Sequence, residues 1–431
     1  MTLTAQLTEH ALAPTPPALR DHLRALTLTN VAAGAGVLGR AGTLIDRLDV
    51  TGRPDEARVA AMRLHARTQD DFFPFGRIHV GAVTLATALA LADDAGDRLL
   101  ECLAAGYDVM CRVAAAYSEL AQERGMRPTG VFGPLGAAAT AAAALDLGPE
   151  GTANAIGLAA TTSAGTNQAW VSGTDEWLLE VGAAARSGVE AAQLTLAGFV
   201  AAPEALEGAA GWARAHFSDD GAERLRAVAA ADRSGAADVA AKPYPVSGIA
   251  NVPAWLACRA HAELDGAEPE AIELGLSAPE AAYPGSANRG PFPSRSAALM
   301  SLAFCVACGA RDGLVSLRAL EDPDDPALET LIDRFTLTVR DDVGESEATL
   351  TVTAGGRRFE LRGTGAEILF PHWDGIDADA VATRSEADPG IVGRAREELM
   401  RDAPDVNALK ALLEEAQCPA GFNPSNAAST S

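Results

Sequence analysis

Apolar residues recur every three to four positions through most of the first 240 residues, a spacing that gathers them on one face of an α-helix. This period predicts helices over residues 54–67, 80–93, 99–124, 133–145, 151–160 and 178–198. Alanine runs fill the same region, and such small residues favour closely packed helices over sheets. Residues 1–20, which include Pro14-Thr15-Pro16-Pro17, are expected to form a loose lead-in to this bundle.

Beyond about residue 268 the apolar period changes to two, the alternation expected of half-buried strands. It predicts strands at residues 272–276, 335–339, 348–352 and 359–361, a hairpin turn at Gly355-Gly356, and a helix at residues 296–313. Helical spacing returns at residues 390–401 and 405–417, and the polar residues 423–431 are expected to be a disordered tail. The pattern therefore predicts a mostly α fold, with a large helical domain and a smaller α+β domain.

Composition narrows the class of protein. A chain of 431 residues is long enough for two domains, and 5% aromatic beside 48% hydrophobic residues fits a mostly α fold. The formal net charge of −24 and the lack of a basic stripe argue against a nucleic-acid partner. With no charged leader and no bilayer-length apolar run, we expect a cytoplasmic protein without a membrane partner. The scattered cysteines predict no disulfide framework, and Cys305 and Cys308 are interpreted as small core residues.

Two segments are chemically distinctive. Residues 128–136 combine three glycines and two prolines ahead of an alanine-rich helix, which predicts a tight loop forming the floor of a pocket. A phosphate-binding loop is disfavoured, because the segment has no Gly-Lys-Ser/Thr and no apolar strand before it. Lys242, one of only two lysines, precedes Pro243-Tyr244-Pro245, whose prolines stiffen the backbone and favour a fixed ammonium over one that merely solvates a loop.

The order of several short motifs resembles the MmgE/PrpD family, which includes 2-methylcitrate dehydratase, cis-aconitate decarboxylase and iminodisuccinate epimerase. The matching segments span roughly residues 20–400 and are His79-Val80-Gly81-Ala82-Val83, residues 100–112, residues 128–136, Ala183-Ala184-Ala185-Arg186-Ser187-Gly188, Lys242-Pro243-Tyr244-Pro245 and residues 301–307. Each motif alone is weak, but their shared order argues against coincidence.

The resemblance implies a fold and a class of reaction. It implies a helical domain built from both chain ends (residues 1–242 plus 388–431) and an inserted α+β lid domain (residues 243–387). It further implies a homodimer and an active site in the cleft between the domains, with no metal or organic cofactor. The family's chemistry removes an acidic proton next to a carboxylate, followed by loss of water, loss of carbon dioxide or reprotonation. Such chemistry needs a base, an acid and cations that hold carboxylates.

Carried over residue by residue, the resemblance assigns catalysis to His79, Lys242 and Asp71. His79 corresponds to the histidine of the family's His-Pro/Ser-Gly segment, and Lys242 to the first lysine of its Lys-Pro-Tyr-Pro segment. Asp70 and Asp71 lie near its aspartate-rich segment, although the spacing to His79 differs and a phenylalanine replaces the usual threonine. The plainer alternative for His79 is a histidine that caps the start of a helix.

Other family positions have changed. Gly125-Met126-Arg127 replaces a Gly-Phe-His segment, residues 176–180 replace a segment with a lysine and a histidine, and Ser247 or Gly248 replaces a later histidine. Basic groups have thus become acidic, apolar or neutral, which disfavours citrate-like substrates. The residues expected to contact substrate are Asp70, Phe73, Met126, Arg127, Thr129, Trp177, Glu180 and Ser247. The large apolar ones, together with Phe72, Phe75 and Phe132, would either line a wide aromatic cavity or pack in the core.

Three functions remain open at this point. The interpretation we favour is an enzyme of specialised metabolism that isomerises, cyclises or eliminates on a bulky, weakly charged, polyketide-like substrate. The second is a hydro-lyase or decarboxylase of a small carboxylic acid, with Arg127 and Lys242 as anion holders, and the third is a non-catalytic binding protein. The pocket discriminates among them. A large aromatic cavity containing Trp177 favours the first, a small cavity lined by cations the second, and a closed cleft the third.

Overall fold

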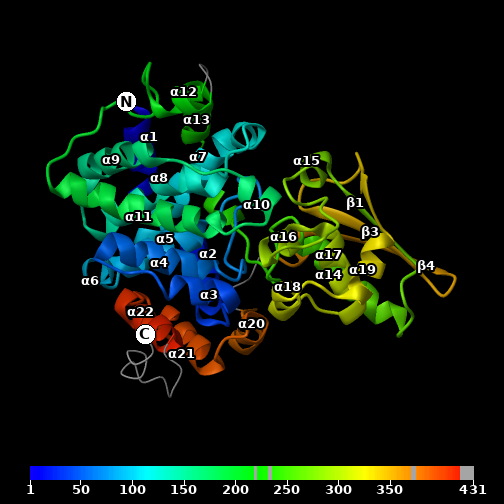
Figure 1. The fold of residues 1–431 in the computed structure, drawn as a ribbon. Coiled ribbons are helices and arrows are strands. Elements are labelled where there is room, and N and C mark those ends of the chain that lie inside the picture. Colours follow the sequence, from blue (N-terminus) through cyan, green and yellow to red (C-terminus); the bar gives the residue numbers. More distant parts are fainter. Residues whose placement is uncertain (218–220, 232–234, 370–374, 418–431) are drawn as a thin grey trace.

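The computed structural model describes residues 1–217, 221–231, 235–369 and 375–417. Helices make up most of the chain and gather into a large bundle, with a small sheet to one side of it (Figure 1). The helices before residue 240 are α1 (Leu3–Ala11), α2 (Pro17–Ala35), α3 (Gly39–Ile45), α4 (Arg53–His65), α5 (Val80–Ala90), α6 (Ala92–Ala95), α7 (Leu99–Glu123), α8 (Pro128–Ala144), α9 (Gly148–Ala159), α10 (Gln168–Ser172), α11 (Glu176–Leu196), α12 (Trp212–His216) and α13 (Gly221–Ala229). The predicted mostly α class is confirmed.

The second half of the chain holds the strands and the remaining helices. These are α14 (Asn251–Leu264), β1 (Ala271–Leu276), α15 (Ala278–Ala281), α16 (Arg295–Met300), α17 (Leu302–Asp312), α18 (Leu317–Glu321), α19 (Pro326–Asp333), β2 (Phe335–Val339), β3 (Glu347–Ala354), β4 (Arg357–Thr364), α20 (Ala378–Ser385), α21 (Pro389–Leu399) and α22 (Val406–Gln417). Single 3₁₀ turns lie at η1 (Ala160–Thr162), η2 (Gly235–Asp238) and η3 (Gly365–Glu367).

The predicted pocket-floor loop at residues 128–136 is wrong, because these residues form the first half of helix α8. Pro128 can begin α8 without the loss of a hydrogen bond, since the first N–H of a helix has no partner within the helix. The glycines of this segment do not form a turn. They allow neighbouring parts of the protein to approach α8 closely. A Cβ atom on Gly133 would lie 2.7 Å from the Cβ of Ala184 in α11, closer than two carbons can approach. Small residues thus let α8 pack at the centre of the bundle against α7 and α11.

Residues 1–20 are not a loose lead-in, which corrects the expectation from sequence. Residues 3–11 form α1, which packs against α7 and α9. Leu3, Leu7 and Ala11 stand four positions apart, so they fall on one face of the helix, and all three are buried in the bundle core. The hydroxyl of Thr2 caps the helix by accepting a hydrogen bond from the backbone N–H of Ala5.

The four strands lie in the order β2-β1-β3-β4. β1 runs parallel to β2 and antiparallel to β3, and the β3–β4 hairpin turns at Gly355 and Gly356, which both have positive φ. Strands and hairpin match the prediction, but α14, which packs on α17 and on the sheet, was not predicted. The predicted helix at 296–313 is divided at Ser301, whose hydroxyl accepts from the backbone N–H of Phe304 and caps α17.

Both ends of the chain belong to the helical bundle, where α21 and α22 pack against α2 (Figure 1). Val381 and Ala382 of α20 join the bundle core, whereas Ala41 and Trp177 pack in the core beside the sheet. Each part therefore contributes side chains to the core of the other along their shared boundary, which we call the seam. The domain boundaries at 242/243 and 387/388 stay a prediction, and the tail expected at 423–431 lies outside the described residues.

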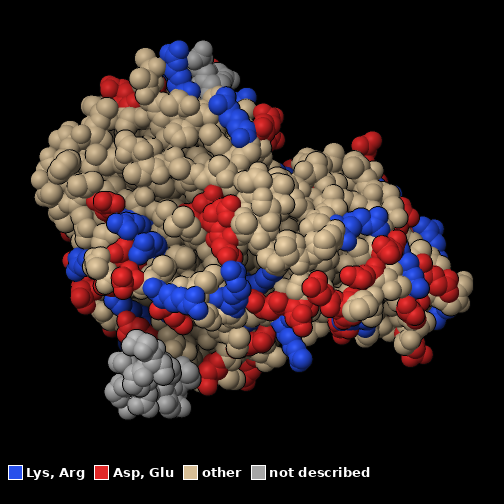
Figure 2. Space-filling view, in the orientation of Figure 1, with Lys and Arg blue, Asp and Glu red and all other residues tan. Residues whose placement is uncertain are grey.

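The surface carries charges of both signs. On the face shown in Figure 2, Lys and Arg side chains are interspersed with Asp and Glu side chains. Among the described helices, none is both long enough and apolar enough to cross a bilayer. The five cysteines of the described residues are free, and Cys305 and Cys308 are buried in α17, as the sequence predicted.

Candidate active site

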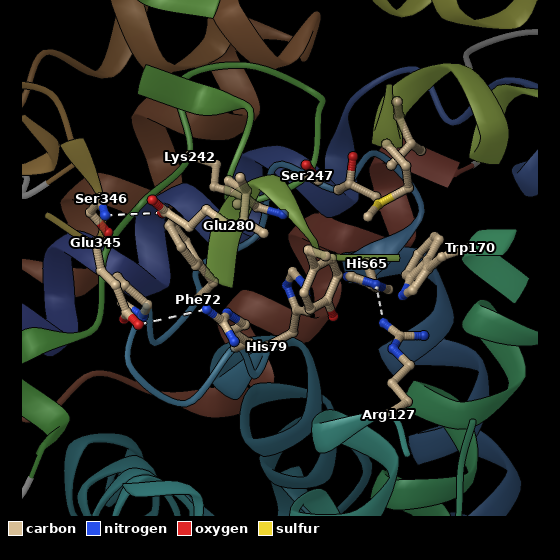
Figure 3. A pocket seen from close by; sticks show the side chains of 18 residues that line it. His65, Phe72, His79, Arg127, Trp170, Lys242, Ser247, Glu280, Glu345 and Ser346 are labelled. Atoms are coloured by element: carbon tan, nitrogen blue, oxygen red, sulfur yellow. Dashed lines mark hydrogen bonds and ion pairs between the residues drawn. The ribbon is translucent and has the colours of Figure 1, made fainter. Parts of the chain in front are cut away.

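A pocket with a volume of about 60 Å³ lies between the helical bundle and the elements around the sheet (Figure 3). The end of α4 and the starts of α5 and α8 form its bundle side, and the segments around residues 247, 280, 300 and 345 form the other. The lining residues are His65, Thr68, Phe72, Pro74, Arg77, His79, Arg127, Trp170, Lys242, Ser247, Gly248, Ile249, Glu280, Tyr283, Leu299, Met300, Glu345 and Ser346.

Asp70 lies beneath this pocket, and three nitrogen-bearing side chains surround its carboxylate. His65 Nδ1 lies 2.9 Å from Oδ2, His79 Nδ1 lies 3.0 Å from the same oxygen, and Lys242 Nζ lies 3.6 Å from Oδ1. Of these contacts, only that of His65 has hydrogen-bond geometry. His65 ends α4 and His79 immediately precedes α5, so the connection between the two helices, residues 66–79, brings both rings to one carboxylate.

Arg127 determines which nitrogen of His65 carries the proton. Its Nη2 lies 3.0 Å from His65 Nε2, and because a guanidinium can only donate, Nε2 must accept. The proton of the neutral ring therefore lies on Nδ1, which donates it to Asp70. Burial lowers the pKa of His65 well below its usual value, so this neutral form is present at pH 7.

Burial also sets the charge of the other groups around Asp70. It lowers the pKa of His79 to about 4, so this imidazole is neutral at pH 7. It lowers the pKa of Lys242 to about 8, so the ammonium remains the main form at pH 7. Burial by itself would raise the pKa of Asp70, but the surrounding basic groups hold it well below its usual value. Because both imidazoles are neutral, Lys242 is the cation that keeps Asp70 ionised.

Lys242 is a buried cation with unused hydrogen-bond donors. It is 3% exposed, and its Nζ forms no hydrogen bond with the described residues, although the ring of Phe72 lies 5.9 Å away. Gly248 and Ile249, which come just before α14, line the same pocket. A buried cation with unused donors therefore lines the pocket, an arrangement that suits one anionic group.

Arg127, by contrast, is already paired. Its Nη1 donates to the carbonyl oxygen of Trp177 and lies 3.3 Å from Glu180 Oε2, and its guanidinium lies 4.9 Å from the ring centre of Trp170. Glu180 also accepts a hydrogen bond of 2.7 Å from the backbone N–H of Thr166. Burial raises the pKa of Glu180, although the Arg127 charge opposes this. The pair holds one wall of the pocket and offers no free cation to a ligand.

The model of the MmgE/PrpD N-terminal domain matches residues 11–225, the segment that supplies His65, Asp70 and His79. The chain belongs to the MmgE/PrpD family. No curated protein matches the chain. Membership of this family suggests an enzyme of the dehydratase or lyase type. Lys242 lies beyond the matched residues, so its assignment rests on the Lys-Pro-Tyr-Pro resemblance and on its place beside Asp70.

Asp71 lies behind the pocket of this MmgE/PrpD protein and does not line it. Its carboxylate accepts hydrogen bonds from Asn30 Nδ2 (2.9 Å), the backbone N–H of Gly81 (2.7 Å) and the hydroxyl of Tyr107. It therefore ties α2, α5 and α7 together. Burial raises its pKa to about 6, because the three hydrogen bonds only partly offset the cost of burying the charge.

We expect Asp71→Asn to remove part of the pH dependence of folding stability. The pKa of Asp71 is raised in the folded protein, so its contribution is present in acid and is lost as the pH rises through about 6. The wild type should therefore lose about 1 kcal/mol relative to the variant between pH 5 and pH 8. Urea unfolding of both proteins at the two pH values measures this difference, and an equal change in both would contradict it.

Four of the residues proposed from sequence line the pocket: His79, Lys242, Arg127 and Ser247. Asp70 contacts two of them from below. Glu180 does not line the pocket, but it accepts a hydrogen bond from Arg127, which does. Thr129 is buried in α8, where its hydroxyl accepts a hydrogen bond of 3.1 Å from the backbone N–H of His79. Thr129 thus positions the start of α5.

The expected wide aromatic cavity is not what the described residues form. Phe73 is buried in the bundle core with Met126 packed beside it, Phe132 is buried there as well, and Phe75 is exposed at the surface. Trp177 packs behind the pocket, with its ring centre 5.1 Å from that of His65. These apolar residues have mainly packing roles, and the aromatic residues that line the pocket are Phe72, Trp170 and Tyr283.

Several pocket residues were not identified from the sequence. His65 lies near the end of the helix predicted at residues 54–67, five positions before Asp70, a spacing that would have been a usable signal. Glu280 and Glu345 come from the elements around the sheet, and only the tertiary fold brings them to the pocket. Glu280 accepts hydrogen bonds from the Ser277 hydroxyl and the Ser346 backbone, and burial raises its pKa.

His65, Asp70 and His79 place potential ligand atoms within 4.8 Å of one another. Both nitrogens of His65 are engaged, one by Asp70 and the other by the guanidinium of Arg127. A divalent cation at this point would also lie beside the Lys242 ammonium, and like charges repel. The donor set therefore fits a hydrogen-bonded acid–base cluster better than a metal centre.

Proposed function

We propose that this protein is a lyase or isomerase that removes a proton next to the carboxylate of a small substrate with one negative charge. The observation that carries the proposal is the shared contact of His79 and Lys242 with Asp70 at the pocket. One carboxylate holds a neutral imidazole beside an ammonium, which gives the base and the acid that such a reaction needs. The family membership supports the same class of chemistry.

His79 is the proposed base. Its Nδ1 faces Asp70, which leaves Nε2 for the substrate, and Asp70 would stabilise the imidazolium formed when Nε2 takes a proton from carbon. Besides burial, the charge of Lys242 contributes to the low pKa of His79. A substrate carboxylate that pairs with Lys242 would offset this charge. Binding of the correct substrate would thereby strengthen the base.

Lys242 is the proposed acid and anion holder. Its free N–H groups would bind the substrate carboxylate and stabilise the negative charge that develops on it when the neighbouring carbon loses its proton. With a pKa of about 8, the ammonium can also give a proton to a departing hydroxide, and water leaves as the carbon–oxygen bond breaks. Return of the proton to carbon, without loss of water, would give an isomerase.

The charges around the pocket favour a substrate with one carboxylate. Arg77 lies 3.7 Å from Glu345, and Arg127 is paired with Glu180, so both guanidiniums are offset. A second carboxylate on the substrate would approach Glu345 or the buried Glu280 of the same lining. The pocket volume of about 60 Å³ suits a small molecule. Citrate-like tricarboxylates are therefore disfavoured on charge.

The alternative functions have less support. A bulky, polyketide-like substrate was inferred from an aromatic cavity, but Trp177, Phe73 and Phe132 do not line the pocket. The weakly charged character inferred at the same time agrees with the paired arginines and is kept in the proposal. A purely binding protein needs no neutral histidine and ammonium on a shared carboxylate.

A binding screen tests the substrate class. We expect small monocarboxylates that bear a hydroxyl group or an acidic C–H to raise the melting temperature and to change mass during incubation. Citrate, 2-methylcitrate and cis-aconitate should have little effect. Stabilisation by a tricarboxylate, followed by loss of water or carbon dioxide, would refute the proposed substrate class, and capture of only large neutral metabolites would favour the polyketide-like alternative.

A further inference from the structure

A second cavity, of about 430 Å³, lies on the far side of Trp177 from the candidate active site. We call it the seam cavity, because residues from both parts of the protein form it. Its lining residues are Arg40, Ala41, Gly173, Thr174, Asp175, Trp177, Leu178, Pro293, Ser294, Arg295, Ser296 and Glu321. The ring of Trp177 packs against Trp170, which lines the first pocket, with 5.5 Å between ring centres. The two tryptophans thus lie between the two cavities.

Arg295 lines the seam cavity and carries buried hydrogen-bond donors that have no partner in the described part of the chain. The residue is 9% exposed, and only its Nη1 has a partner, Glu321 Oε1 at 3.3 Å. Its Nε and Nη2 are buried and form no hydrogen bond with the described residues. These two nitrogens lie on the same edge of the planar guanidinium, and their parallel N–H groups match the two oxygens of a carboxylate. Burial lowers the pKa of Arg295 only to about 10, so the group remains a cation at pH 7.

The other polar groups of the seam cavity limit the charge of its ligand. Trp177 Nε1 is a second buried donor without a partner in the described part of the chain. Asp175 forms an ion pair with Arg40 at 2.9 Å, and Glu321 forms one with Arg295. The negative charges of both acids are thus partly neutralised, but they would still repel a second anionic group on the ligand. The seam cavity therefore favours a ligand with a single carboxylate.

Apart from the exposed Thr174, the rest of the wall is either apolar or already hydrogen-bonded. The hydroxyls of Ser294 and Ser296 donate to the carbonyl oxygens of Gly173 and Thr174, and they hold the two sides of the seam together. Ala41 and other apolar neighbours complete the surface beside Trp177. A ligand body in contact with this wall would be apolar and flat enough to pack beside an indole.

We propose that the seam cavity is a second binding site, distinct from the candidate active site, for a small monocarboxylate with an apolar body, held by the Nε–Nη2 edge of Arg295. Trp177 packs against such a ligand on one face of the site and donates its indole N–H to it. The proposal does not depend on the reaction assigned to the first pocket.

Benzoate is the probe for this site, and benzamide, which has the same shape without the charge, is its neutral control. We expect benzoate to raise the melting temperature of the full-length protein saturably and to change tryptophan fluorescence, with little effect from benzamide. Arg295→Lys keeps the charge but removes the paired N–H groups, and it should weaken benzoate binding at least about tenfold. Arg318→Gln, an exposed arginine of α18, is the matched control and should bind as the wild type does.

A second variant tests the cavity without changing Arg295. Thr174 is exposed on the cavity wall, and Thr174→Trp should fill the space and weaken benzoate binding even if Arg295→Lys does not fold. Undiminished binding in Thr174→Trp, or in folded Arg295→Lys, would overturn the proposal. So would phosphate binding in place of benzoate, or loss of benzoate binding in Lys242→Met, which would assign the ligand to the first pocket.

Discussion

Replacing His79 by glutamine should lower turnover of the substrate about a thousandfold, while substrate affinity stays close to that of the wild type. Glutamine keeps a polar side chain of similar size at the start of α5 but cannot take a proton from carbon. Because Thr129 binds the backbone and not the ring of this residue, the helix start should remain in place. The measurement is kcat and KM for a substrate identified in the carboxylate screen.

His261→Gln is the matched control, because this histidine lies on α14, away from the pocket, with Nδ1 3.1 Å from the carbonyl oxygen of Ala310. It should leave kcat unchanged. If His79→Gln retains most of the wild-type kcat, His79 is not the base and the proposed mechanism is wrong. A loss of affinity with normal kcat would instead assign His79 to substrate binding alone.

Replacing Lys242 by methionine should weaken monocarboxylate binding by about 10- to 100-fold, as expected when a charged hydrogen bond is lost. It should also raise the pKa of His79. In the wild type the Lys242 ammonium disfavours the imidazolium and Asp70 favours it, so only the effect of Asp70 remains in the variant. This shift reports the charge of Lys242 beside His79, and the loss of affinity reports its role in binding the ligand. Binding is measured by calorimetry, and the histidine is titrated by NMR.

The chain supplies the control for this variant, since Lys410 is its only other lysine and forms an ion pair with Glu56 on α4. Lys410→Met should bind the monocarboxylate as the wild type does. Protein labelled with ¹³C at lysine Cε should give two side-chain signals, one of which disappears in Lys242→Met. That signal should titrate near pH 8. An unchanged His79 titration in the variant would contradict the proposed contact.

Most elements of the fold could be predicted because their apolar residues are periodic. The period-two segments became β1 to β4, and the long helices α7 and α11 began and ended within a few residues of their predicted limits. Residues 128–136 misled the prediction, since glycine and proline have the same local preferences in a loop as at the start of a tightly packed helix. Only the neighbouring helices, which leave no room for a Cβ on Gly133, decide between the two.

The candidate site was predicted in part. His79 and Lys242 could be named from motifs, and both line the pocket. Asp70 and Asp71 are adjacent in sequence, yet one contacts the pocket bases and the other binds Asn30 and Tyr107 behind them. Their side chains point in different directions, and neither composition nor spacing reveals which of the two faces the pocket. The pairing of Arg127 with Glu180 likewise depends on how α8 and α11 pack.

The most direct test of the account is hydrogen–deuterium exchange at carbon. The protein is incubated in D₂O with a panel of small mono-, di- and tricarboxylates, and the mass of each acid is followed with and without His79→Gln. The account predicts that a monocarboxylate gains deuterium next to its carboxylate, or loses water, with the wild type only. Exchange confined to tricarboxylates, or equal exchange with His79→Gln, would contradict it.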